Sequence, residues 1–313
     1  IIGCRQFFIN NKKSKDQRSI DKTSYKRLIT NFSYGMAALS IFKYQDSDNA
    51  KELLANLSGT DKQNRRWVAR EIQNDDLQNY EKLLSDKAVV KYFSLERPWT
   101  SNEINARLNI WETRYKEGHP HGALTIFDEQ NHFIGYIIAG EGNEESVSEV
   151  AYVISPEYWN RGIAQSVLSK IVGDWGTEVR NIGLGKGIEK LGKQHQIVEK
   201  RFQCFKKKVL KQFYASARPI NIPSWHILEK VGFTNAKSAV ENVDDPIDFN
   251  VKGFDLPSLD HYNQLESFIE ELYKKQEIKV DKRYFMINDN DKIYTFNRTT
   301  NGKIRFHYEK EIC

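Results

Sequence analysis

Residues 149–175 constrain the fold more than any other part of the chain. The apolar run 150–154 is typical of a buried strand, and Pro156 ends it because proline cannot donate to a sheet ladder. Apolar side chains then recur at helical spacing from Ile163 to Val172. The short loop between these two segments therefore lies where a strand leads into the first turn of a helix.

Such a loop is suited to binding an anion. Unpaired backbone N–H groups and the positive end of the helix dipole meet at a helix N-terminus. Gly162 lets the backbone approach a phosphate closely because it has no Cβ. The residues that we expect to bind the phosphate are Asn160, Arg161, Gly162, Ile163 and Ala164.

A second capped helix is predicted in residues 221–233. Asn221 can cap a helix that starts near Pro223, because proline is tolerated in the first helical turn. Gly232 suits the position after the helix end, where left-handed backbone is common. Taken alone, this segment could be a capped helix without chemistry.

Together the two segments resemble the motifs of the GNAT acetyltransferases. Residues 159–164 (WNRGIA) resemble motif A, Gln/Arg-x-x-Gly-x-Gly/Ala before a helix, although Trp159 stands at its first position. Residues 221–233 resemble the family's Asn-x-x-Ser/Ala…Glu-Lys-hydrophobic-Gly-Phe ending. Tyr158 and Trp159 before the loop, with a weaker match upstream, are similar to the RimJ/RimL branch of ribosomal-protein acetyltransferases. The resemblance covers roughly residues 65–255.

The resemblance implies the α/β (α+β) class and the GNAT fold, a mixed, mostly antiparallel central sheet flanked by helices. Strand patterns at 123–128, 133–139, 147–154 and 212–218 fit that fold. We expect a helical N-terminal extension in residues 1–64, with helices at 28–44 and within 46–64. The acetyltransferase domain is expected in residues 65–256, with a Lys-rich insertion at 176–211. Residues 257–313 are expected to form a helix plus a β-meander, either as an appended subdomain or in a homodimer interface.

The resemblance also implies acetyl-CoA as cosubstrate and an amine acceptor. In the family, the loop amides hold the pyrophosphate, and the pantetheine arm inserts between two splayed strands. Acetyl transfer to an amine needs a base, an oxyanion donor and an acid for the leaving thiolate. Glu149 is the candidate base, since a carboxylate on a buried strand could have the raised pKa that this role requires. A solvated or ion-paired Glu149 is the alternative, and Glu144 or Glu145 could substitute.

The other expected site residues follow from the same resemblance. Many family members use a tyrosine as the acid, but Leu228 stands at that position here. Ser224 aligns with a serine near the sulfur and either donates to the thiolate or only caps the helix. Asn221 is expected to bind the pantetheine or the helix backbone. The oxyanion donor is expected to be a backbone N–H near Val153 or Ile154.

Composition narrows the remaining function classes. A net charge of +5 over 313 residues does not by itself indicate a nucleic-acid partner. No apolar run approaches the ~18–20 residues that span a bilayer, so we expect no membrane partner. Cys4, Cys204 and Cys313 are widely spaced and form no metal motif, which favours a reducing compartment and hence the cytoplasm.

Three further patterns have an alternative interpretation each. His119 and His121 flank Pro120, but no third ligand is paired with them, so we expect a loop and no metal site. The GLGKG segment at 183–187 lacks the ending of a P-loop and favours a hinge. The lysines at 206–208 are typical of a solvated helix face, although they could attract an acidic partner.

Two hypotheses for the function stand beside an acetyltransferase. One is a non-catalytic acyl-CoA-binding or interaction module, and the other is a protein-modifying factor whose insertion docks a macromolecular partner.

Overall fold

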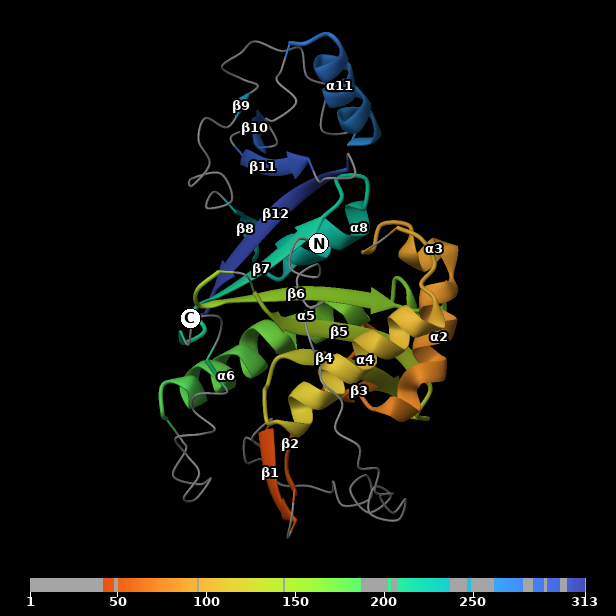
Figure 1. The fold of residues 1–313 in the computed structure, drawn as a ribbon, viewed down its shortest axis with the longest axis vertical. Helices are drawn as coiled ribbons and strands as arrows, with labels where there is room; N and C mark the ends of the chain where they lie inside the picture. Colours follow the sequence, from red (N-terminus) through yellow and green to blue (C-terminus); the bar gives the residue numbers. More distant parts are fainter. Residues whose placement is uncertain are drawn as a thin grey trace. The chain divides into compact units, whose positions relative to one another are not determined.

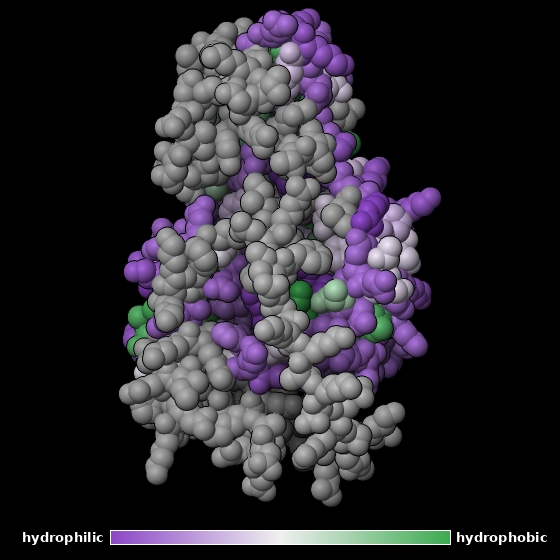
Figure 2. Space-filling model, in the orientation of Figure 1, coloured by the Kyte–Doolittle hydropathy of each residue, from purple (hydrophilic) through white to green (hydrophobic). Residues whose placement is uncertain are grey.

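The computed structural model describes residues 42–47, 50–94, 96–142, 144–186, 202–203, 208–236, 247–248, 262–277, 284–289, 292–298 and 303–312. All of them belong to the compact unit Ile41–Cys313. Within these residues, no helix is long and apolar enough to cross a bilayer. The described surface in Figure 2 is mostly hydrophilic, with small and separate hydrophobic patches.

The described strands form one twelve-stranded sheet in the order β1-β2-β3-β4-β5-β6-β7-β12-β11-β10-β9, with β8 paired to β12 (Figure 1). The strands are β1 (Phe42–Ser47), β2 (Ala50–Thr60), β3 (Arg66–Glu71), β4 (Gly122–Asp128), β5 (Phe133–Glu141), β6 (Val147–Ile154), β7 (Gln212–Ala217), β8 (Thr234–Asn235), β9 (Ile247–Asp248), β10 (Tyr284–Asp289), β11 (Lys292–Arg298) and β12 (Ile304–Glu311). Among these strands, β6–β7 and β9–β10 are the parallel pairs. The mixed, mostly antiparallel sheet that the sequence predicts is therefore confirmed.

Helices cover both faces of this sheet. They are α2 (Leu77–Ser85), α3 (Lys87–Val90), α4 (Ser101–Lys116), α5 (Ile163–Lys170), α6 (Gly176–Gly183), α8 (Ile222–Lys230) and α11 (Tyr262–Lys274). Tyr80 of α2 and Trp111 of α4 pack on Tyr136 of β5, with ring centroids 4.7 and 6.1 Å away. On the opposite face, Trp67 Nε1 donates to Ser166 Oγ of α5 at 3.1 Å. We call these the α4 face and the α5 face.

Local sequence signals explain the ends of several helices. Thr100 and Glu103 form a reciprocal capping box at the start of α4, which satisfies two orphan N–H groups. Gly232 follows α8 with φ +88°, the left-handed conformation predicted for it. The helix that begins at Ile163 continues through a π-helical turn, Ile171–Trp175, into α6. The predicted insertion at 176–211 therefore begins as a continuation of this helix, and residues 187–201 lie outside the described chain.

The helical prediction for the N-terminal segment is wrong wherever the structure describes it. Residues 42–47 and 50–60 are strands, and β2 pairs with β3 in register from Asn56↔Arg70 to Thr60↔Arg66. Phe42 and Leu57 are buried, so their apolar side chains contribute to the sheet core. The open edge of β3 supplies partners that override local propensity. The rest of the helix predicted at 28–44 lies outside the described residues.

The predicted C-terminal helix and three-strand meander are confirmed as α11 and β10, β11 and β12. Strand β12 pairs antiparallel with β7 from Phe306↔Ala217 to Glu311↔Gln212, so the meander continues the main sheet. The short strand β9, Ile247–Asp248, pairs in parallel with β10 at the edge of this part of the sheet. The division into three domains stays a prediction, but strand pairs cross both of its boundaries.

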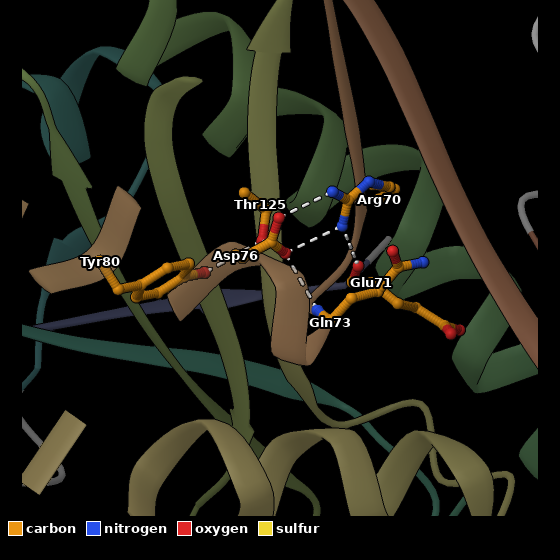
Figure 3. Close-up of polar contacts among 6 residues, drawn as sticks. All are labelled: Arg70, Glu71, Gln73, Asp76, Tyr80 and Thr125. Carbon is orange, nitrogen blue, oxygen red and sulfur yellow. Dashed lines mark hydrogen bonds and ion pairs between the residues drawn. The ribbon is translucent and has the colours of Figure 1, made fainter. Parts of the chain in front are cut away.

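A buried carboxylate ties β3, β4 and the start of α2 together on the α4 face (Figure 3). Two Arg70 nitrogens, the Gln73 amide and the Thr125 hydroxyl donate to Asp76 at 2.7–3.0 Å. Because the Thr125 proton goes to Asp76, Tyr80 is the donor in its 3.1 Å bond to Thr125. We call these five residues the Asp76 cluster. Such a network fixes the geometry of its elements because each of its groups has a partner.

Candidate active site

The site begins where β6 and β7 separate. Their parallel pairing covers Val147↔Gln212, Ser148↔Phe213 and Glu149↔Tyr214 and goes no further. Strand β6 nevertheless continues to Ile154, and β7 continues to Ala217. Beyond Glu149 and Tyr214, the facing backbone edges of β6 and β7 are therefore not paired with each other.

Backbone alternation shows which groups of β6 face β7. Ser155 N donates to Ile134 O at 2.8 Å, so the odd-numbered residues of this strand direct their N–H groups toward β5. Ile154 O accepts from Trp159 Nε1 at 2.6 Å, which is consistent with the opposite direction for even-numbered residues. The N–H of Ile154 is therefore directed toward the β7 side, and that of Val153 belongs to the ladder with β5.

The predicted loop forms the N-terminus of α5 as expected. Gly162 is the N-cap residue with φ +81°, and Asn160 has φ +62°. No described side chain caps this helix, and the Ser166 N–H donates to Gly162 O as the first helical bond. The preceding amides at Ile163 and Ala164 are therefore left for an anion.

Tyr158 attaches the loop to the β4–β5 turn. Tyr158 donates to Asp128 Oδ2 at 3.0 Å, and the Arg161 guanidinium lies 4.6 Å from the centre of the Tyr158 ring. Burial raises the pKa of Asp128, but hydrogen bonds from His132 and Tyr158 outweigh this effect and hold the pKa below its usual value. Burial and the bond to Asp128 raise the pKa of Tyr158 to about 12. Tyr158 thus stays protonated and fixes the loop to the β4–β5 turn.

Lys62 in the β2–β3 turn lies against the same loop. Its N–H donates to Arg161 O at 3.0 Å. A Cβ added to Gly162 would lie 2.6 Å from Lys62 Cγ and 3.0 Å from its Cε. The turn itself is fixed by Asp61, which accepts from Gln63 N and Arg65 N at 2.8 and 3.0 Å. A lysine from the turn that follows β2, a strand predicted to be helical, thus borders the N-terminus of α5.

Ser224 faces the same region from α8, on the α5 face. Tyr152 of β6 donates to Ser224 O at 2.8 Å, and the two hydroxyl oxygens are 3.2 Å apart. Burial raises the pKa of Tyr152, so this residue is protonated at neutral pH. Asn221 occupies the N-cap position of α8, but its side chain makes no capping hydrogen bond. The predicted helix is confirmed, whereas side-chain capping by Asn221 is not observed.

Glu149 lies on the α4 face, opposite Ser224. Register places its side chain beside Tyr214, which in turn lies opposite Glu309 of β12. Two more residues of β12, His307 and Arg305, share this face because alternate residues of a strand point the same way. Glu149 is half-buried. The predicted base Glu149 therefore borders a cluster of polar side chains that the sequence analysis did not predict.

That polar group, which we call the Arg305 cluster, consists of Tyr214, Ser216, Arg305 and His307. The Tyr214 hydroxyl hydrogen-bonds His307 Nδ1. Arg305 donates from Nε to Ser216 Oγ at 3.0 Å and from Nη2 to Ser216 O at 3.1 Å. Burial lowers the pKa of Arg305, and nearby Tyr214, Glu96 and Glu149 oppose the shift. Burial and the Arg305 charge lower the pKa of His307 to about 3, so this imidazole is neutral.

Of the remaining predicted features, His121 lies in the core, and Lys206, Lys207 and Gly187 lie outside the described residues. His121 is buried with its ring 5.5 Å from Trp175, and burial lowers its pKa to about 3. Sequence patterns missed Tyr152, Lys62 and the Arg305 cluster. Tyr152 could have been found as a polar side chain within an apolar strand, but Lys62 and Arg305 carry no local signal because distant strand pairing brings them here.

Comparison with known proteins agrees with this geometry. The sequence model of the acetyltransferase (GNAT) domain family matches residues 66–234. The uncharacterized N-acetyltransferase YnaD of Bacillus subtilis (strain 168) is 24% identical over 168 residues, 54% of this chain and 79% of the relative.

Two solved structures are similar at low identity. An acetyltransferase (GNAT family) from Bacillus anthracis has a TM-score of 0.41 and 14% identity, covering 79% of this chain and 95% of that one. RimL, a ribosomal-protein alpha-N-acetyltransferase in complex with coenzyme A, has a TM-score of 0.43 and 11% identity, covering 79% and 94%. The assignment rests on the family match, which spans more than half of the chain. The chain belongs to the acetyltransferase (GNAT) domain family and is an acetyl-CoA-dependent acyltransferase.

Proposed function

We propose that this protein moves an acetyl group from acetyl-CoA to a primary amine by direct attack in a ternary complex. The observation that carries the proposal is the uncapped N-terminus of α5, which follows directly after the strand whose pairing with β7 ends at Glu149. The N-terminus of α5 offers N–H donors for the pyrophosphate of acetyl-CoA, and β6 offers unpaired backbone groups for its pantetheine arm. Acetyl-CoA carries both groups, so it matches these two neighbouring elements.

The anion-binding part comprises the loop of Asn160, Arg161, Gly162, Ile163 and Ala164. The Ile163 and Ala164 amides point out of the first turn, and a phosphate there also meets the positive end of the helix. Lys62 adds an exposed cation beside Gly162. Asn221, whose side chain does not cap α8, binds the pantetheine arm.

The pantetheine arm lies along the β6 edge beyond Glu149, where its amides replace the missing strand partner. The thioester carbonyl then accepts from the Ile154 N–H, the donor retained from the predicted pair Val153 and Ile154. An oxyanion at this position is stabilised as the tetrahedral intermediate forms. Backbone donors of a rigid strand cost little reorganisation during the reaction.

Proton transfer is divided between the two faces of the sheet. Glu149, on the α4 face, takes a proton from the attacking amine as the N–C bond forms. The C–S bond then breaks, and the Ser224 hydroxyl on the α5 face donates a hydrogen bond to the leaving coenzyme A thiolate. The proton that Glu149 took from the amine is released to solvent, and the thiolate takes one up from solvent. Tyr152 has its own proton on Ser224 O, so it positions Ser224 and leaves the serine hydroxyl hydrogen for the sulfur. The products are the acetylated amine and coenzyme A.

The acceptor is the primary amine of a protein N-terminus, a lysine or a small molecule, as in the RimJ/RimL-like branch that the sequence resembles. The experiment is titration calorimetry with acetyl-CoA, followed by thiol release with a panel of amines and N-terminal peptides. Acetyl-CoA binding with amine-dependent thiol release supports the proposal. Binding without turnover for any amine would favour the non-catalytic acyl-CoA-binding module.

A further inference from the structure

A buried arginine beside the candidate base has unused hydrogen-bonding capacity. Arg305 is 8% exposed, and its Nη1 has no hydrogen-bond partner among the described residues. His307, two residues along the same strand, is 6% exposed, and its Nε2 is also without a partner. Burying a donor without an acceptor costs about 1–3 kcal/mol, and more for a charged group. Two groups that carry this cost thus lie two residues apart on the same face of β12.

Both groups can donate. The guanidinium has donors only. Neutral His307 carries one ring proton, and assigning the Tyr214 hydroxyl as the donor to Nδ1 leaves that proton on Nε2. Arg305 and His307 then present one N–H each toward the same face of the sheet. A carboxylate, with two acceptor oxygens and a negative charge, matches this pair.

Charge around the cluster supports an anionic partner. The second buried arginine on this face, Arg218, has its carboxylates in place, with ion pairs to Glu96 and to Glu266. Arg305 has no such pair among the described residues, where its hydrogen bonds go to Ser216. Among the described residues, one guanidinium on this face is thus ion-paired with two carboxylates and the other with none.

The Arg305 cluster lies beside the residue that we propose as the base. Glu149, which we propose as the base, pairs in register with Tyr214, and Tyr214 bonds His307. An acceptor whose amine reaches Glu149 therefore extends its remaining groups along β7 and β12. Arg305 and His307 lie on β12, outside residues 66–234 that match the family model, whereas Tyr214 and Ser216 lie within them.

We propose that the acceptor is an amine that also carries a carboxylate, which Arg305 and His307 bind while the amine meets Glu149. This inference rests on the proposed acetyl transfer and names its substrate class. A polyamine is disfavoured, because its second cation would lie against Arg305.

The test compares kcat/KM for L-amino acids and their carboxamides, which differ only in the anionic group. Phosphoethanolamine and spermidine complete the panel. We expect the wild type to prefer the carboxylates by about 10- to 100-fold, as a charge-assisted pair of hydrogen bonds provides. In Arg305→Met this preference falls to near unity, because KM rises more for the carboxylates than for the carboxamides. Lys310→Met, a cation lost from the other face of the same strand, keeps the preference.

A second measurement protects the test from failed folding or absent turnover. N-acetylated L-amino acids are titrated into wild type, Arg305→Met and Arg305→Lys in the presence of coenzyme A, and their affinity is measured. Thermal unfolding verifies that each variant is folded. Binding lost in Arg305→Met and weakened in Arg305→Lys supports the inference. Three results overturn the inference but not the proposed acetyl transfer. They are turnover of amines without a preference for carboxylates, a preference for phosphoethanolamine or spermidine, and binding that survives Arg305→Met. Absence of acetyl-CoA binding and of all turnover instead overturns the proposed function.

Discussion

Two polar clusters are buried on the α4 face of the same sheet, and they differ in how completely their groups are paired. In the Asp76 cluster, the carboxylate accepts from three residues, and the Thr125 and Tyr80 hydroxyls form a directed chain (Figure 3). In the Arg305 cluster, Arg305 and His307 each have one donor without a described partner. The first arrangement is what stability requires. The second is what a binding site requires before its ligand arrives.

The strongest way to break this comparison is to remove the charge at Asp76. Asp76→Asn leaves Arg70 without its carboxylate and disrupts the buried network, so we expect the free energy of unfolding to fall by about 3 kcal/mol. Denaturant unfolding measures the loss. The matched control is Asp75→Asn, an exposed neighbour, which should change stability very little. Equal losses in the two variants would contradict a special role for the cluster.

Glu149→Gln tests the base that borders the unpaired cluster. The substitution preserves shape but cannot take a proton, so we expect kcat to fall about 100-fold. Acetyl-CoA affinity, measured by calorimetry, should be unchanged because the anion site is distant in the loop. Glu144→Gln, in an exposed loop, should retain activity. Activity retained in Glu149→Gln and lost in Glu144→Gln would transfer the role to the loop.

Arg305→Met tests whether the Arg305 cluster contributes less to the free energy of unfolding than the Asp76 cluster does. Replacing an incompletely paired buried charge by an apolar side chain of similar length is often neutral or stabilising, so we expect a change below about 1 kcal/mol. Denaturant unfolding beside Asp76→Asn gives the contrast directly. A loss as large as that of Asp76→Asn would show that Arg305 serves the fold.

Lys62→Gln has a smaller expected effect, confined to the cosubstrate. Lys62 is exposed, so the loss of its attraction to a phosphate should raise KM for acetyl-CoA only about fivefold. The difference should shrink as salt is added, because exposed charges are screened. Lys82→Gln in α2 is the control. An unchanged KM would remove Lys62 from the anion site.

The smallest expected effect is a pH dependence at the turn that holds the loop. The pKa of Asp128 is lowered in the folded state, so its ionised form contributes stability above its unfolded pKa, and this contribution is lost as pH falls through the folded pKa. The stability difference between wild type and Asp128→Asn should therefore be present at pH 7 and shrink below about pH 4. Unfolding curves at both pH values test this. A difference that grows in acid would have the wrong sign.

The sequence predicted elements whose signals are local. Strand β6 was predicted with its observed bounds because an apolar run ends directly before Ser155 and Pro156. The N-terminus of α5 followed from Gly162. Residues 50–60 were assigned wrongly because their strand exists through pairing with β3, which no local pattern reveals. The roles of Glu149 and Ser224 remain predictions. The neighbourhood of Arg305 could not be foreseen, since pairing over a sequence separation of nearly a hundred residues creates it.

Pairing between β7 and β12 has a consequence for how the chain is made. Gln212 and Glu309 are 97 residues apart, so a ribosome adds the family-like part of the chain well before β12. Until β12 arrives, the nascent β7 is an edge strand with open hydrogen-bonding groups that can recruit strands of other chains. Contacts this distant also form slowly. Chains that are interrupted before residue 304 should therefore be the aggregation-prone products of this gene.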